Sequence, residues 1–260
     1  MSVTAIPNDD MQNISPAWQS RVDLAASHRL AVKHEFNEGI FNHFTLAVPE
    51  TDDRYYQIPF GTHWSEVSAS TFMEVGYDGS LLEGEGEIER SGYCIHAPIH
   101  RLVPRARCVL HTHMPFASAL ARLKDPQILP IGQTEIGIMM QTGYDPLYTG
   151  PAFEVAEGER LVEALGDHNI LIMANHGVLT VGKTVAEAYD RLYYLERVAQ
   201  VQLYAMWTGQ ELNPLPQNVI DDTIHSYKKL APKYAGKSNA EHHFEALKRI
   251  LDREQPDYCE

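Results

Sequence analysis

The 260-residue chain is poor in cysteine, and none of its cysteines lie at the spacing of a Cys-x-x-Cys motif. Cys94, Cys108 and Cys259 are odd in number. This pattern favours free thiols in a reducing compartment over a disulfide framework. Residues 1–13 also lack the basic and apolar regions of a signal peptide, so we expect a cytoplasmic protein.

Positive charge is scarce too, and long apolar runs are missing. Lys and Arg number 21 against 35 Asp and Glu, which gives a formal net charge of −14. Because a phosphate-binding surface needs a basic excess, nucleic acid and anionic membranes are not expected as partners. No apolar run approaches the roughly 20 residues of a membrane-spanning helix. With 44% hydrophobic residues, the chain can instead bury one large core.

The order of local patterns predicts a mixture of helices and short strands. Ser15-Pro16 is typical of a helix start, and we expect this helix to reach about Glu38, with Gly39 ending it. Alternating segments separated by turns predict antiparallel strands at 42–48, 55–59 and 73–75. Further strands are predicted at 107–113, near 137–139, and at 170–174 and 178–181. Further helices are predicted at 92–103, 115–123, 155–165, after Thr184, and at 221–230 and 240–253.

Three parts are expected along the chain. The polar residues 1–14 are predicted to be disordered, and residues 15–212 to form the main domain. A proline-rich stretch at 213–216 then leads into a helical extension, residues 213–260, which we expect to pack on the same domain.

Three histidines stand out at predicted strand ends. His111 and His113 are spaced by two and therefore point to the same face of a strand, and His176 closes a second apolar run. Imidazole is a common metal ligand, although a single buried histidine is more often a hydrogen-bonded structural residue. Three histidines that converge from two strand ends predict a metal site.

The order of the motifs resembles the class II aldolase and adducin family between about Leu24 and Trp207. Five stretches carry the resemblance: Phe41-Asn42-His43-Phe44-Thr45, Pro59-Phe60-Gly61 with Trp64-Ser65-Glu66-Val67, Gly92-Tyr93-Cys94-Ile95-His96, Val109-Leu110-His111-Thr112-His113, and Ala174-Asn175-His176-Gly177-Val178 with Gly182-Lys183-Thr184 after it. The resemblance implies an α/β fold of three layers, α/β/α, with a central, mainly antiparallel sheet, and assembly as a homotetramer.

The resemblance also implies a set of site residues. His111, His113 and His176 match the metal-binding histidines of the family, which most often hold zinc, with manganese and iron as alternatives. Asn42 and Gly61 match residues that line the phosphate or carboxylate end of the substrate pocket.

One position departs from the family pattern. Sugar-phosphate aldolases of the family carry a Ser-Ser-Glu motif whose glutamate binds the metal and transfers a proton, whereas this chain has Arg90-Ser91-Gly92. Glycine can do neither. The same replacement occurs in the adducin branch, whose head domain is regarded as non-catalytic. We still place Ser91 and Gly92 among the residues expected at the substrate.

A three-histidine metal keeps an open position, which is the arrangement of catalytic sites. We therefore predict a carbon–carbon lyase, of aldolase or decarboxylase type, that acts on a small hydroxy- or keto-acid or sugar derivative through a metal-stabilised enolate. Tyr148 and His96 are candidate proton donors, although the spacing of His96 also fits a buried structural histidine. Glu87 and Glu89 could replace the missing carboxylate or belong to a solvated loop. The alternatives are a non-catalytic adducin-like interaction module and a non-haem iron oxygenase.

Overall fold

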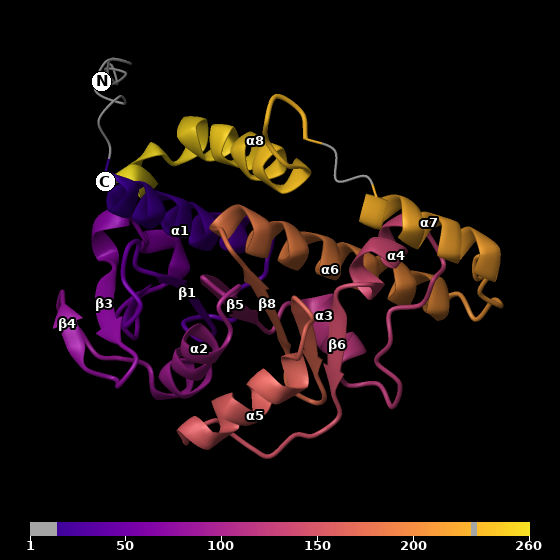
Figure 1. Ribbon diagram of the computed structural model, residues 1–260, viewed down its shortest axis with the longest axis horizontal. Helices are drawn as coiled ribbons and strands as arrows, with labels where there is room; N and C mark the ends of the chain where they lie inside the picture. Colours follow the sequence, from indigo (N-terminus) through magenta and orange to yellow (C-terminus); the bar gives the residue numbers. More distant parts are fainter. Residues whose placement is uncertain (1–14, 230–232) are drawn as a thin grey trace.

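The computed structural model describes residues 15–229 and 233–260, and a sheet of eight strands forms its centre (Figure 1). The strand order is β4-β3-β2-β1-β5-β8-β7-β6, and only the β6–β7 pair is parallel. The strands are β1 His43–Ala47, β2 Arg54–Gln57, β3 Met73–Gly76, β4 Leu81–Glu83, β5 Cys108–Thr112, β6 Thr142–Asp145, β7 Ile170–Met173 and β8 Val178–Gly182. The predicted disorder of residues 1–14 lies outside the described residues.

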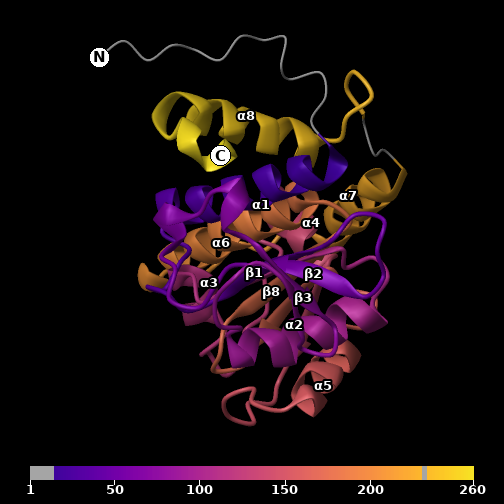
Figure 2. The same ribbon diagram turned by 90° about the vertical axis from the view of Figure 1, so that its left-hand side faces the viewer.

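Helices cover both faces of the sheet. They are α1 Pro16–Lys33, α2 Arg90–Leu102, α3 Pro115–Leu120, α4 Gln133–Met139, α5 Val155–Leu165, α6 Val185–Trp207, α7 Gln217–Lys229 and α8 Asn239–Glu254. Helices α1 and α6 lie on one side and α2 and α5 on the other, while α8 lies outside α1 and α6 (Figure 2). The predicted α/β fold of three layers with a mainly antiparallel sheet is therefore confirmed.

The alternation of side chains along β1 and β5 separates two apolar cores. Phe44 and Leu110 belong to the core under α1 and α6. Val109 belongs to the core under α2 and α5. Because successive strand residues point to opposite faces, His43 and His111, which are register partners, lie on the α2 side. Among the described residues, no helix is long and apolar enough to span a bilayer.

Two of the sequence-based assignments are wrong. Helix α1 ends at Lys33 instead of about Glu38, because Glu35 adopts a left-handed conformation (φ +62°) that ends the helix. The strand expected near residues 137–139 is part of helix α4, and the strand comes later, at Thr142–Asp145. A short apolar run such as Ile136 to Met139 fits a buried helix as well as a strand.

Helix α2 begins at Arg90 and contains Pro98 in its interior. A proline has no N–H for the carbonyl four residues earlier, here that of Cys94. Helix α5 passes so close to this carbonyl that a Cβ on Gly158 would lie 2.1 Å from its oxygen. Helix α5 therefore packs closely on α2 at Gly158, next to the turn of α2 in which Pro98 removes a hydrogen bond.

Candidate metal centre and its cavity

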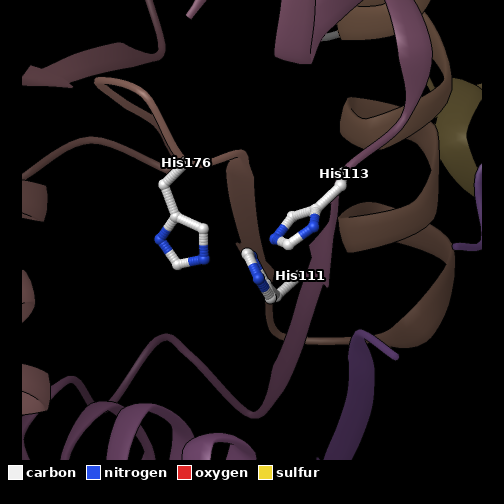
Figure 3. A group of neighbouring side chains, drawn as sticks. All are labelled: His111, His113 and His176. Atoms are coloured by element: carbon white, nitrogen blue, oxygen red, sulfur yellow. The ribbon is translucent and has the colours of Figure 1, made fainter. Parts of the chain in front are cut away.

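His111, His113 and His176 lie around one common space (Figure 3). His111 belongs to β5, His113 follows its end, and His176 lies in the turn between β7 and β8. One ligand atom from each lies within 4.8 Å of the other two, and the ring centroids are 4.9 to 5.0 Å apart. The structure thus brings together the three histidines that the sequence selected.

The turn that carries His176 depends on its two neighbours. Asn175 adopts a left-handed conformation (φ +55°), which asparagine tolerates better than most residues. A Cβ on Gly177 would lie 2.6 Å from both Cδ2 of His113 and the carbonyl oxygen of Thr112. Glycine at this position therefore lets the β7–β8 turn pack directly against the other two histidines.

Hydrogen bonds fix how two of the rings present their nitrogens. Nδ1 of His111 donates to the carbonyl oxygen of Val178 at 2.9 Å, and Nδ1 of His113 donates to Oε2 of Glu38 at 2.6 Å. Each neutral ring then has its lone pair on Nε2. Nε2 of His113 is buried and has no hydrogen-bond partner in the described chain. This pattern fits a metal, because metal-bound histidines usually donate their other N–H to a carboxylate or carbonyl.

Burial favours the uncharged form of two of the three rings, those of His111 and His176. It lowers the pKa of His111 well below its usual range, and nearby histidines lower it further. Burial likewise lowers the pKa of His176 to about 4, with His113 adding to the effect. Neutral imidazole is the form that binds metal ions. The donor set and its electrostatics therefore both suit a divalent cation.

A cavity of about 310 Å³ opens beside the three histidines. Asn42, Ser91 and Tyr148 line it, and the Tyr148 ring centroid lies 6.1 Å from that of His176. Gly61, Gly92 and His96 are outside its lining, so a direct role of these three at the substrate stays a prediction. Gly61 is exposed, with φ +93° and open space around it, while His96 is fully buried.

Asn42 combines a strained backbone with a buried amide. Its φ is +74°, and its Oδ1 accepts a hydrogen bond from the backbone N–H of His113 at 3.2 Å. Its Nδ2 is buried without a partner in the described chain. An unpaired buried donor in a cavity wall is costly unless a ligand accepts from it.

Sequence reasoning missed His43. Its ring stacks on that of His111 at 5.0 Å and lines the same cavity. The alternation in Asn42–Val48 places His43 and Thr45 on one face, but only the pairing of β1 with β5 places that face beside His111. Glu89, one of the two glutamates that could replace the missing carboxylate, caps α2 and also lines the cavity.

An eight-stranded, mainly antiparallel sheet between helical layers, with three histidines around a cavity, is the architecture of the class II aldolase type. Residues 22–203 match the family model described as "Class II Aldolase and Adducin N-terminal domain", and the chain belongs to this family.

Its relatives include both branches of the family. A Pseudomonas aeruginosa protein named as a candidate class 2 aldolase is 34% identical, with 99% of this chain and 98% of that protein covered. An aldolase II superfamily protein of Pseudomonas syringae shares the fold with a TM-score of 0.87 and 33% identity, over 97% of this chain and 100% of the other. Rat alpha-adducin is 28% identical over 89% of this chain, which spans 33% of that protein.

Proposed function

We propose that this chain is a metal-dependent carbon–carbon lyase, of aldolase or decarboxylase type, that acts on a small hydroxy- or keto-acid or sugar derivative. The observation that carries the proposal is the convergence of three histidines beside a cavity, with Nδ1 of His111 and of His113 held by protein acceptors. His111, His113 and His176 would hold the metal, with zinc favoured over manganese and iron. When bound there, it would stabilise the negative charge that develops on an enolate oxygen.

The chain's own residues supply the rest of the site. Nδ2 of Asn42 is a free donor in the cavity wall, suited to a carboxylate or phosphate oxygen of the substrate. Tyr148 is half exposed and lies beside His176, where its hydroxyl could donate a proton to a product. Ser91 provides a further hydroxyl.

We also propose that the protein works as a homo-oligomer in the cytoplasm, with a tetramer as the expected state. Phe41, Tyr148 and Phe153 line the cavity, and each is more than half exposed. Apolar side chains of this size around a cavity mouth favour cover by another protein surface. Light scattering coupled to size-exclusion chromatography tests this assembly, and a monomer at micromolar concentration would contradict it.

A non-catalytic interaction module is the second candidate. The similarity to alpha-adducin favours it, and so does Gly92 at the position where sugar-phosphate aldolases carry their glutamate. In that case the histidines would hold a structural metal or none.

Elemental analysis followed by a substrate screen separates the two. The purified protein is expected to contain one divalent metal ion per chain. Samples loaded with Zn²⁺, Mn²⁺ or Fe²⁺ are then incubated with hydroxy acids, keto acids and sugar phosphates, and aldehyde or CO₂ release is measured. The His113→Ala variant serves as the metal-deficient control, and His225→Ala, an exposed histidine in α7, as the neutral one. Full metal content without turnover of any compound would favour the interaction module.

A further inference from the structure

Behind the cavity lies a second group of three histidines, which we call the buried histidine network: His43, His96, His100 and the hydroxyl of Thr45. Nδ1 of His43 lies 3.0 Å from Nε2 of His96, and Nδ1 of His96 lies 2.6 Å from Oγ1 of Thr45. The same hydroxyl is 2.8 Å from Nε2 of His100. All four side chains are buried, and their hydrogen bonds form one unbranched line.

The far end of this line fixes the direction of every bond in it. Nδ1 of His100 lies 2.9 Å from the carbonyl oxygen of Ala106, which can only accept, so this nitrogen carries the proton. Nε2 of His100 therefore accepts from the Thr45 hydroxyl. Having donated its only proton, Thr45 must accept from Nδ1 of His96.

The same reasoning continues to the cavity. Nε2 of His96 accepts from Nδ1 of His43, which leaves the lone pair of His43 on Nε2. The burial of these rings supports one proton on each, because it lowers the pKa of His96 well below its usual range and that of His100 to about 3. A single backbone carbonyl thus sets the tautomer of a ring that lines the cavity.

Nε2 of His43 faces a second acceptor. Oε2 of Glu89 lies 3.6 Å away, and the Glu89 carboxylate already accepts from the backbone N–H groups of Ser91 and Gly92. The Ser91 hydroxyl lies 2.9 Å from both carboxylate oxygens but 3.5 Å from His43, so its proton belongs to Glu89. Two acceptors therefore face each other in the cavity wall with no donor between them.

Glycine at position 92 makes room for this pair. A Cβ there would lie 3.0 Å from two atoms of the His43 ring and 3.1 Å from Oε2 of Glu89. Any larger side chain would have to displace one or both. Position 92 therefore has no carboxylate, and the acceptors of His43 and Glu89 lie where its side chain would begin.

We propose that Nε2 of His43 and Oε2 of Glu89 form a hydroxyl-binding subsite beside the metal centre, which takes an O–H group of the substrate. His96, Thr45 and His100 are positioning residues that keep the His43 lone pair turned toward it. The proposal rests on the proposed function for its substrate class, a small hydroxylated acid. In this subsite, a side-chain acceptor binds a hydroxyl group of the substrate. Gly92 has no side chain that could do so.

The tautomers are tested first, on the metal-free wild-type protein. Two-bond ¹⁵N–¹H correlation spectra of the imidazoles are expected to show His43, His96 and His100 with the proton on Nδ1. In Thr45→Val, which lacks the hydroxyl, the His96 and His43 signals are expected to change, whereas Thr45→Ser retains the wild-type pattern. A neutral His43 with its proton on Nε2 in the wild type overturns the proposal, whether or not the variants fold.

Ligand preference is tested second, on zinc-loaded protein, by calorimetry with lactate, 3-hydroxypropanoate and propanoate. We expect at least one hydroxy acid to bind about tenfold more tightly than propanoate, as for one added hydrogen bond. In Glu89→Gln, whose amide can donate to His43, and in His43→Phe, this preference is expected to vanish. Glu85→Gln, at an exposed position of the same segment, is expected to keep it.

The two proposals fail in different ways. Equal binding of all three acids at full zinc content overturns the subsite and leaves the metal-dependent lyase standing. Protein that binds no zinc but keeps the three Nδ1–H tautomers removes the proposed lyase, while the hydrogen-bond assignment of the network stands.

Discussion

Two groups of three histidines lie next to each other in this protein, and their hydrogen bonds differ. In the metal centre, the Nδ1 atoms of His111 and His113 are held by fixed acceptors, and their Nε2 lone pairs are left free. In the buried histidine network, His96 and His100 have both ring nitrogens engaged.

Residue type alone therefore does not identify a metal-binding histidine. A histidine whose two nitrogens both have protein partners contributes to packing and positioning, whereas one with a buried, unpaired nitrogen has room for a ligand. His43 connects the two groups, because it ends the network and its ring stacks on that of His111. Substitutions in the two groups are therefore expected to have opposite consequences.

The largest effect is expected for His111→Ala. Loss of one of three ligands should lower zinc affinity by more than about 100-fold, beyond the cost of removing an outer partner. The metal-free variant should remain folded, because the lost ring borders a cavity. Competition with a zinc chelator measures the affinity, and circular dichroism measures the fold. A variant that unfolds would instead indicate a structural metal.

His100→Ala should show the reverse pattern. The ring stacks on Tyr55 at 5.2 Å and is hydrogen-bonded at both nitrogens, so its removal leaves a cavity and two unpaired groups. We expect the free energy of unfolding to fall by about 3 kcal/mol, with zinc content unchanged. Urea denaturation and elemental analysis check both halves. A large loss of zinc with unchanged stability would remove the distinction between the two groups.

Acid should reveal the burial of His100 in the metal-free protein. The pKa of His100 is about 3 in the fold against an ordinary 6.5, because burial disfavours its charged form. As pH falls from 6.5 toward 3, the unfolded chain binds a proton that the folded chain does not, so stability decreases. Between pH 7 and pH 5 this one group should cost about 2 kcal/mol. Urea denaturation of wild type and His100→Ala at both pH values should show a smaller loss in the variant.

Local patterns in the sequence were sufficient for much of the fold. Alternation identified β1, β2 and β3, and the helix predicted after Thr184 is the long helix α6. The order of motifs supplied the family and thereby the layers. Helix α4 and strand β6 were assigned incorrectly because the short apolar run near Ile138 carries no decisive period.

The candidate site was predictable in part, for a physical reason. His111 lies in β5 and His113 directly follows its end, so their convergence is local, and the family order added His176. The network of His43 is non-local: it needs the register of β1 against β5 and the docking of α2 on the sheet. No local pattern states which residues face each other across strands, which is why the partners of His43 emerge only from the structure.

The smallest expected effect concerns the outer partner of the metal centre. Glu38 is the acceptor for Nδ1 of His113, and its side chain is largely exposed. Glu38→Ala should weaken zinc binding by about tenfold, since the ring loses the bond that orients it and raises its basicity. Glu38→Gln keeps an acceptor without the charge, so its zinc affinity should lie between that of Glu38→Ala and that of the wild type.

Glu85→Gln removes the same charge from an exposed loop and is the matched control. Its zinc affinity should equal that of the wild type, measured by the same chelator competition. If Glu85→Gln and Glu38→Ala weaken binding equally, the effect of Glu38 is only that of net charge. Orientation of the ligand by a hydrogen bond would then no longer distinguish the metal centre from the buried histidine network.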